Sequence, residues 1–205
     1  MTSKSFDELS DEMLNGYLKI NPDAGTALGI HEPYDWQLPH GGFKKLEESL
    51  AILESWYKKA NGLATSEELD VDQRLSIKTL KTAIDVVEFS IEDYPIWKMY
   101  PDAFEWFGGL LFVMVSRDYA PFDQRVSAIC SRLGRLPKYL EQFRTRFKDP
   151  KSVHVWTRIA ISVCESMPGF LRVIEESSRG RVSESLHEDL RKGVSDASAA
   201  IDEHL

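Results

Sequence analysis

Apolar residues recur at helical intervals along nearly the whole chain, and this periodicity is the feature that most constrains the fold. One stretch carries apolar side chains three and four residues apart at Ile77, Leu80, Ile84, Val87 and Ile91. This spacing places side chains on one face of an α-helix, whereas a half-buried strand would alternate apolar and polar residues. The sequence contains no comparable alternating run of β-branched residues. It therefore predicts an all-α protein.

Capping residues, glycines and prolines divide the periodic pattern into about seven helices. The expected helices cover residues 5–20, 43–61, 70–94, 102–116, 121–147, 153–174 and 183–201. Pro137 should kink or restart the fifth helix, and Pro168 should bend the sixth. Residues 21–42 contain three prolines and a Gly-Gly pair, so we expect the longest loop there.

Length and composition favour a single helical bundle formed by one domain over residues 1–205. A chain of 205 residues can bury a sizeable core without disulfides or metals. Its hydrophobic fraction of 42% and charged fraction of 28% are ordinary for globular proteins. Cys130 and Cys164 lie among apolar residues without the CxxC spacing of a redox or zinc site, so we expect buried free thiols.

The net charge and the N-terminal residues indicate which partners and which cellular compartment to expect. The formal net charge of -8 disfavours binding to nucleic acid or to an anionic membrane surface. Residues 1–12 are polar and acidic and lack the basic start and apolar stretch of a secretory leader, so we expect a cytoplasmic protein. The most apolar run, residues 107–115, is about half of the ~20 residues that a membrane-spanning helix needs.

Neither of the two His-Glu pairs completes the HExxH pattern, which aims two imidazoles and a glutamate at one zinc ion. Asp35 stands where the pair His31-Glu32 would need its second histidine, and Pro33 interrupts that helix. Arg191 stands at the corresponding place after residues 187–188, and a cation cannot bind zinc. Phosphate-binding loops and serine-nucleophile elbows are also lacking. We therefore expect no metal, no cofactor and no enzymatic activity from this chain alone.

The loop over residues 29–36 is the first candidate site. It places His31 and Asp35 in a turn shaped by glycine and proline and flanked by two aromatic residues. Polar groups in such loops often bind ligands. This favours a stand-alone module that binds a small ligand or peptide, or a weak hydrolase that uses the two side chains. In the alternative interpretation, His31 and Asp35 only cap the loop.

An aromatic segment over residues 94–112 is the second candidate, as an interface. It is richer in aromatic residues than a helix connection needs, and its candidate interface residues are Trp97, Tyr100, Phe104, Trp106 and Phe107. Such side chains dominate contacts between proteins. Burial in the protein's own core is the other interpretation of this segment.

Several short segments resemble domain-of-unknown-function family 885. They are PDAGTALGIH at residues 22–31 with Asp35 four residues further on, SRDY at 116–119, RL at 132–133 and LPKYL at 136–140. Their order and spacing are similar to the family over essentially the whole chain. Gly25 stands where the family usually has alanine.

The resemblance implies a role for the chain. Members of that family are longer helical proteins that resemble zinc metallopeptidases, with an HExxH helix in a C-terminal part that this chain does not contain. The chain would then correspond to the non-catalytic, helical N-terminal part. It would act by association with a separately encoded catalytic half or with a second copy of itself. A fragment of a longer protein and a stand-alone relative fit the sequence equally.

Overall fold

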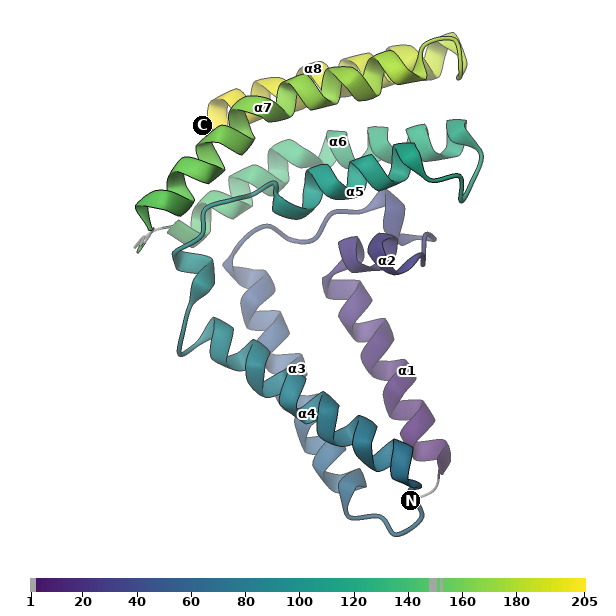
Figure 1. Ribbon diagram of the computed structural model, residues 1–205, viewed down its shortest axis with the longest axis vertical. Coiled ribbons are helices and arrows are strands. Elements are labelled where there is room, and N and C mark those ends of the chain that lie inside the picture. The colour runs from purple at the N-terminus through teal and green to yellow at the C-terminus, as the bar shows by residue number, and fades with distance from the viewer. Residues whose placement is uncertain (1–2, 148–150, 152) are drawn as a thin grey trace. The chain divides into compact units, whose positions relative to one another are not determined.

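The computed structural model describes residues 3–147, 151 and 153–205 (Figure 1). The described residues form eight α-helices and three short 3-10 helices and include no strand, which confirms the all-α prediction. The α-helices are α1 (Ser3–Ile20), α2 (Pro22–Leu28), α3 (Phe43–Ala64), α4 (Val71–Ile91), α5 (Glu105–Ser116), α6 (Phe122–Arg144), α7 (His154–Ser178) and α8 (Glu184–His204). The 3-10 helices are η1 (Tyr34–Trp36), η2 (Ile96–Lys98) and η3 (Thr145–Phe147).

The helix that the sequence did not predict is α2, which lies in the segment expected to be a loop. Pro22 occupies its first turn, where the fixed φ of proline suits a helix and no N–H is needed. Gly29 ends it in the left-handed conformation, φ 81°, and its N–H bonds to the carbonyls of Gly25 and Thr26. Proline and glycine therefore mark the two ends of a short helix here. The expectation of a loop over residues 21–42 is wrong for α2 and η1.

Proline does not divide the long helices. Pro137 lies inside α6, which runs without interruption from Phe122 to Arg144, and Pro168 lies inside α7. The helix therefore does not restart at Pro137. Side-chain caps begin two other long helices. Asp70 forms a capping box with Gln73 at the start of α4, and Ser183 accepts a hydrogen bond from the N–H of Leu186 at the start of α8.

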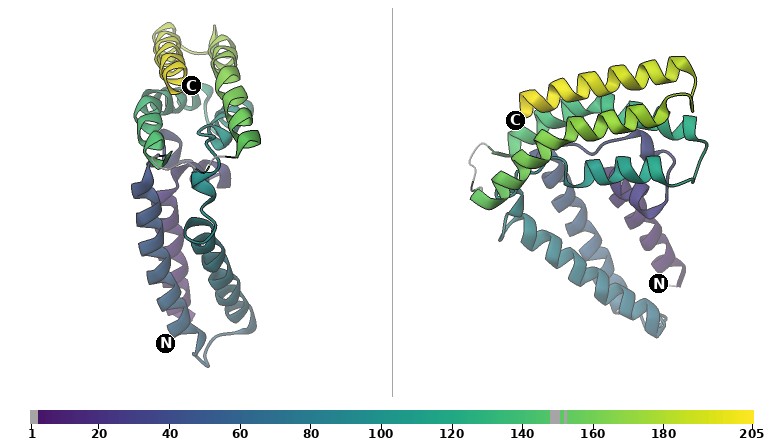
Figure 2. Two further views of the ribbon diagram at one scale, coloured as in Figure 1. Left: turned by 90° about the vertical axis from the view of Figure 1, so that its left-hand side faces the viewer. Right: turned by 45° about the horizontal axis from the view of Figure 1, so that its top comes forward.

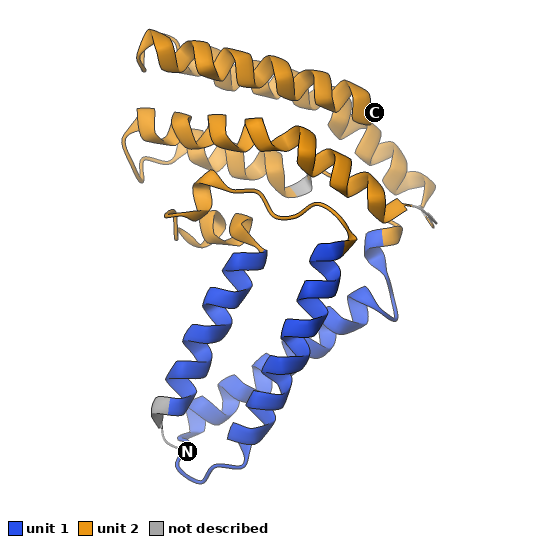
Figure 3. Ribbon diagram, turned by 180° about the vertical axis from the view of Figure 1, so that it is seen from behind, with its two compact units in different colours: residues 1–20, 44–97 blue, residues 21–43, 98–205 orange. Residues whose placement is uncertain are grey.

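The helices group into two compact units, coloured separately in Figure 3. Unit 1 comprises residues 1–20 and 44–97, and unit 2 comprises residues 21–43 and 98–205. The structure thus supports helical units and not one bundle of seven helices. That residues 1–205 form a single domain stays a prediction.

Unit 1 contains α1, α4 and nearly all of α3, and it has two small apolar clusters. Leu9 packs with Ala60, Leu63, Leu69 and Ile77 in the first, and Trp56 packs with Leu53 and Ile84 in the second. Gly16 allows α1 to approach α3, because a Cβ atom there would lie 2.6 Å from a ring carbon of Trp56. These clusters give unit 1 a thin core.

Unit 2 has the larger core. In it α7 and α8 lie side by side, α8 packs along α6, and α5 lies beside α6 (Figure 2). Fully buried residues from all four helices meet, among them Leu111, Ile129, Leu171 and Leu190. The segment over residues 21–43 packs against α5 and α6 through α2 and η1. This packing carries the loop residues of the candidate site to one face of α6.

Candidate functional site

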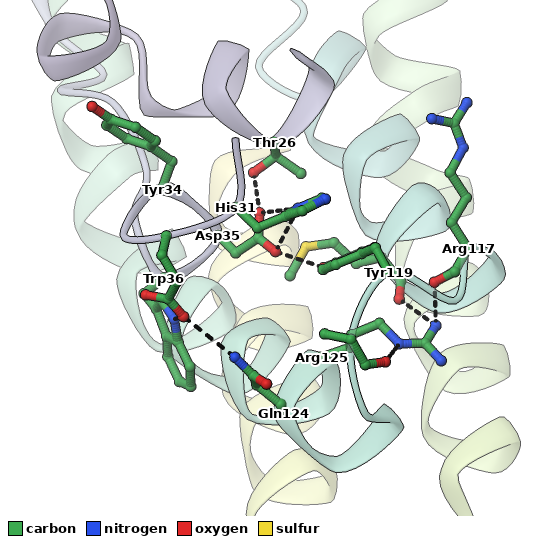
Figure 4. Close-up of polar contacts among 12 residues, drawn as sticks. Thr26, His31, Tyr34, Asp35, Trp36, Arg117, Tyr119, Gln124 and Arg125 are labelled. Atoms are coloured by element: carbon green, nitrogen blue, oxygen red, sulfur yellow. Dashed lines mark hydrogen bonds and ion pairs between the residues drawn. The ribbon is translucent and has the colours of Figure 1, made fainter. Parts of the chain in front are cut away.

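Asp35 is the centre of a buried polar network in unit 2 (Figure 4). Its carboxylate accepts hydrogen bonds from the hydroxyls of Thr26 and Tyr119, each at 2.6 Å. His31 Nδ1 lies 3.1 Å from one carboxylate oxygen and 3.3 Å from the other. Only 4% of Asp35 is exposed, so these three partners replace the water that an ionised carboxylate would otherwise bind.

Arg132 supports this network from α6. Its Nε donates to the backbone carbonyl of Asp35 at 2.8 Å, and its Nη2 donates to Thr26 Oγ1 at 2.6 Å. The Thr26 hydroxyl therefore accepts a hydrogen bond from Arg132 and donates one to the carboxylate of Asp35. Burial lowers the pKa of Arg132, while the charge of Asp35 opposes that shift. The buried guanidinium of Arg132 thus links α2, η1 and α6 through hydrogen bonds.

Its neighbours hold His31 in one orientation. Because the carboxylate of Asp35 accepts hydrogen bonds, the Nδ1 of His31 must carry the proton, as in other histidines oriented by a carboxylate. The imidazole lies parallel to the ring of Tyr119, with centroids 3.5 Å apart and planes 4° apart. In the neutral imidazole the remaining ring nitrogen, Nε2, is then a hydrogen-bond acceptor on a half-buried side chain.

Tyr119 stays a hydrogen-bond donor over the whole physiological pH range. Burial raises the pKa of its phenol well above the usual value, and the hydrogen bond to Asp35 raises it further. Arg125 fixes the loop that carries Tyr119. Its guanidinium donates to the carbonyls of Met114, Val115, Arg117 and Ala120 and to the carboxylate of Asp118. It thereby satisfies carbonyls that the end of α5 leaves without helical partners.

Glycine permits the close packing that assembles the site. A Cβ atom at Gly25 would lie 2.5 Å from Cγ of Tyr34, so a larger residue at this position would displace the ring. Gly41 similarly allows the chain to pass against the backbone of α6, where its N–H bonds to the side chain of Gln142. Alanine, which the resembled family usually has at position 25, would not fit this arrangement.

A pocket of about 310 Å³ adjoins the network. Its lining residues come from the segment after α2, from the loop before α6 and from the start of α6. They are His31, Glu32, Asp35, Trp36, Tyr119, Ala120, Pro121, Gln124, Arg125 and Ala128. Glu32 lies at its exposed side and accepts hydrogen bonds from the indole N–H of Trp36 at 3.0 Å and from the amide of Gln124 at 3.4 Å. The lining residues include no serine, threonine or cysteine. The titratable side chains of the pocket are those of His31, Glu32, Asp35, Tyr119 and Arg125.

The structure brings together the two residues of the first candidate feature, the His31/Asp35 loop, and separates the residues of the second, the aromatic segment. His31 and Asp35 come together, although Asp35 is buried in its own hydrogen bonds and only His31 offers a polar atom to the pocket. The aromatic segment does not form one face. Phe104 and Phe107 lie in the core of unit 2, where the ring of Phe104 meets those of Phe107 and His204 edge-on, whereas Trp106 is 66% exposed.

The remaining residues of that segment are partly covered. Trp97 is half-buried in unit 1, and its indole N–H bonds to the carbonyl of Ile91. Tyr100 is half-buried in unit 2, where its ring meets the edge of Trp156. That these aromatic residues form an interface stays a prediction.

Sequence reasoning gave no role to three members of the network, Thr26, Tyr119 and Arg132. All three lie in the short segments that carry the family resemblance. Their shared occurrence in those segments is the feature that could have indicated them.

Metal binding and membrane spanning have no visible structural basis in the described part of the chain. No group of three or more His, Cys, Asp or Glu residues within residues 3–147, 151 and 153–205 is placed to bind a metal ion. None of the helices in these residues is both long and apolar enough to cross a bilayer. The absence of zinc stays a prediction for elemental analysis.

Comparison with known proteins identifies the fold without naming a function. The sequence matches no family model and no curated protein. A solved chain from Shewanella oneidensis, described as "a putative lipoprotein of unknown function", shares the fold with a TM-score of 0.82 and 16% sequence identity. The match covers 97% of the present chain and 36% of that chain. The present chain thus spans about a third of the length of the protein that it resembles in structure.

This comparison corrects the predicted location. Lipoproteins are held at membranes by covalently attached lipid, and the protein with the shared fold is described as one. The cytoplasmic location expected from the polar first residues is wrong in the light of this comparison. A polar N-terminal helix reports on local structure and not on the compartment of the protein.

Proposed function

We propose that the chain is a non-catalytic helical module that works by binding a further helical layer. In this view the layer comes either from a separately encoded catalytic half, as the resemblance to family 885 implies, or from a second copy of the chain. The observation that carries the proposal is an uncovered apolar face on α4. The match to only 36% of a longer chain supports it as well.

Helix α4 has apolar side chains on two opposite sides. Ile77 and Ile84 face the core of unit 1 and are 2% exposed. Leu75, Val86 and Phe89 are more than half exposed, and at about 100° per residue they fall within about 60° of one another on the opposite side. A helix that is apolar on both sides is expected to be covered on both sides.

The exposed side chains of unit 1 also support a partner that covers α4. The described part of the unit exposes about as many large apolar side chains as it buries apolar residues. The exposed ones are Leu14, Tyr17, Val71, Leu75, Val86, Val87, Phe89, Tyr94 and Ile96. Contiguous exposed apolar surface marks contact sites, and Leu75, Val86 and Phe89 lie on one side of α4.

Sedimentation velocity across a range of concentrations, together with binding of a hydrophobic dye, tests the proposal. If a second copy covers α4, the mean mass rises with concentration and the double variant Val86→Ser/Phe89→Ser stays monomeric. If the partner is a different chain, the protein is monomeric but binds dye, and the same variant loses that binding. Val173→Ser, at an equally exposed position on α7, should change neither result. A monomer whose dye binding is unaffected by the α4 changes would contradict the proposal.

A further inference from the structure

We propose that the pocket beside His31 binds an organic cation that carries N–H donors, such as an ammonium, amidinium or guanidinium group. This inference is independent of the proposed association, since the site lies wholly within unit 2 and needs no partner chain. It rests on the polar atoms that face the pocket, on the balance of charge around it, and on its aromatic walls.

The polar atoms offered to a ligand are acceptors. The Nδ1 of His31 is occupied by Asp35, so the neutral ring offers the lone pair of Nε2. One carboxylate oxygen of Glu32 binds Trp36 and Gln124, and the other has no hydrogen bond within the described residues. A ligand that donates hydrogen bonds fits both groups, whereas an anion would face two sets of lone pairs.

The positive charges nearby are already neutralised. Arg125 lines the pocket, but its guanidinium is directed at backbone carbonyls and at Asp118, which lies 2.7 Å from Nη2. Arg132 is fully buried, does not line the pocket, and supports Asp35. The carboxylate of Glu32 is therefore the exposed charged group of the described pocket lining without an ionic partner, and it favours a cation.

Aromatic surfaces complete the match. Trp36 and Tyr119 both line the pocket. The imidazole of His31 covers one face of Tyr119 and the guanidinium of Arg125 lies 5.8 Å from the centroid of the same ring, so Trp36 is the aromatic side chain left for a ligand. The faces of aromatic rings attract cations, most strongly where water is partly excluded. A flat cation can therefore contact an aromatic surface and the carboxylate of Glu32 at the same time.

Benzamidine is a suitable probe because it is flat, cationic and rich in N–H donors, and benzamide is its neutral counterpart. Binding is followed by NMR from the indole resonance of Trp36, assigned with Trp36→Phe. We expect saturable binding of benzamidine that is roughly tenfold tighter than that of benzamide, as one charge-assisted contact would give. Glu32→Gln should weaken benzamidine roughly tenfold and leave benzamide unchanged.

Glu188→Gln provides the matched control, since Glu188 is exposed on α8 and pairs with Arg191. It should leave both affinities as in the wild type. Three results would overturn the inference: no saturable shift with benzamidine, equal affinity for the two compounds, or a preference for benzamidine that survives Glu32→Gln. A monomeric chain that still binds benzamidine would contradict the proposed association and leave this inference standing.

Discussion

The imidazole of His31 lies flat on the phenol ring of Tyr119 at 3.5 Å, and both side chains bond to the carboxylate of Asp35. Tyr119 lies 84 residues beyond Asp35 in the chain. The pair thus connects the loop after α2 to the loop before α6. The stacking on Tyr119 and the hydrogen bond to Asp35 orient the imidazole of His31, which lines the pocket. The first prediction concerns the contribution of the Tyr119–Asp35 hydrogen bond to stability.

Tyr119→Phe removes one of the three donors to a carboxylate that is almost fully buried. We expect the free energy of unfolding to fall by about 1–3 kcal/mol, because the carboxylate loses a partner that water cannot easily replace. Urea unfolding followed by circular dichroism measures this. Tyr34→Phe is the control, as the Tyr34 hydroxyl has no hydrogen bond within the described residues, and an equal loss in both variants would contradict the assigned role.

Arg132→Met should be more damaging. It leaves the carbonyl of Asp35 and the hydroxyl of Thr26 without their donor in a site with no exposure, and we expect a loss of about 3–5 kcal/mol. Arg135→Met, one turn further along α6 at an exposed position, should cost less than about 0.5 kcal/mol. Thermal unfolding of the two variants tests this prediction. Similar melting temperatures for Arg132→Met and Arg135→Met would show that the network around Asp35 does not stabilise the fold.

Two glycine substitutions should have opposite signs. Gly25→Ala places a methyl group 2.5 Å from Tyr34 Cγ, so we expect destabilisation by about 1–3 kcal/mol. Gly134→Ala adds a methyl group with no atom within 4 Å inside α6, and should stabilise by about 0.5–1 kcal/mol. Denaturant midpoints test both. Stabilisation by Gly25→Ala would contradict this account and show that Tyr34 can move to make room in α2 for an alanine.

Stability should fall in mild acid because of His204. Burial, and to a smaller extent the charge of Arg144, lowers its pKa below the ordinary value of 6.5. In the window between the lowered pKa and 6.5 the unfolded chain binds a proton that the folded chain does not. The contribution of His204 is therefore fully present above pH 6.5 and is lost as the pH falls.

Unfolding free energies at several pH values test this. His204→Phe, which places a ring beside Phe104 and Phe143, should flatten the dependence between pH 5 and 7. His154→Phe, at the exposed start of α7, should leave the dependence unchanged. A wild-type stability that does not change between these two pH values would contradict the assignment to His204.

Local features of the sequence were sufficient to predict the long helices. The spacing of Ile77, Ile84 and Ile91 predicts α4, and Asp70 and Ser183 do cap the helices after them. The short helix α2 was missed because proline and glycine also signal loops, and only their order distinguishes the two cases. The second apolar side of α4 was missed because periodicity identifies one face and does not show that the opposite face is uncovered.

The site could be predicted only in part, for a physical reason. His31 and Asp35 are four residues apart, so their pairing is local and visible in the sequence. Tyr119 and Arg132 reach them from 84 and 97 residues away through the packing of α2 and η1 on α6. No local pattern encodes that approach. The approach of α6 to this segment depends on the burial of Arg132, and arginine is a residue type that is expected at the surface.

The protonation form of His31 tests the account of the site most directly, because the network around Asp35 and the acceptor offered to the pocket both depend on it. A long-range ¹H–¹⁵N correlation spectrum at pH 8 distinguishes the two nitrogens of the ring, and Tyr119→Phe assigns the resonances of His31. We predict a proton on Nδ1 and an unprotonated Nε2. A neutral ring with its proton on Nε2 would contradict the hydrogen bond to Asp35, and with it the acceptor that the pocket offers to a ligand.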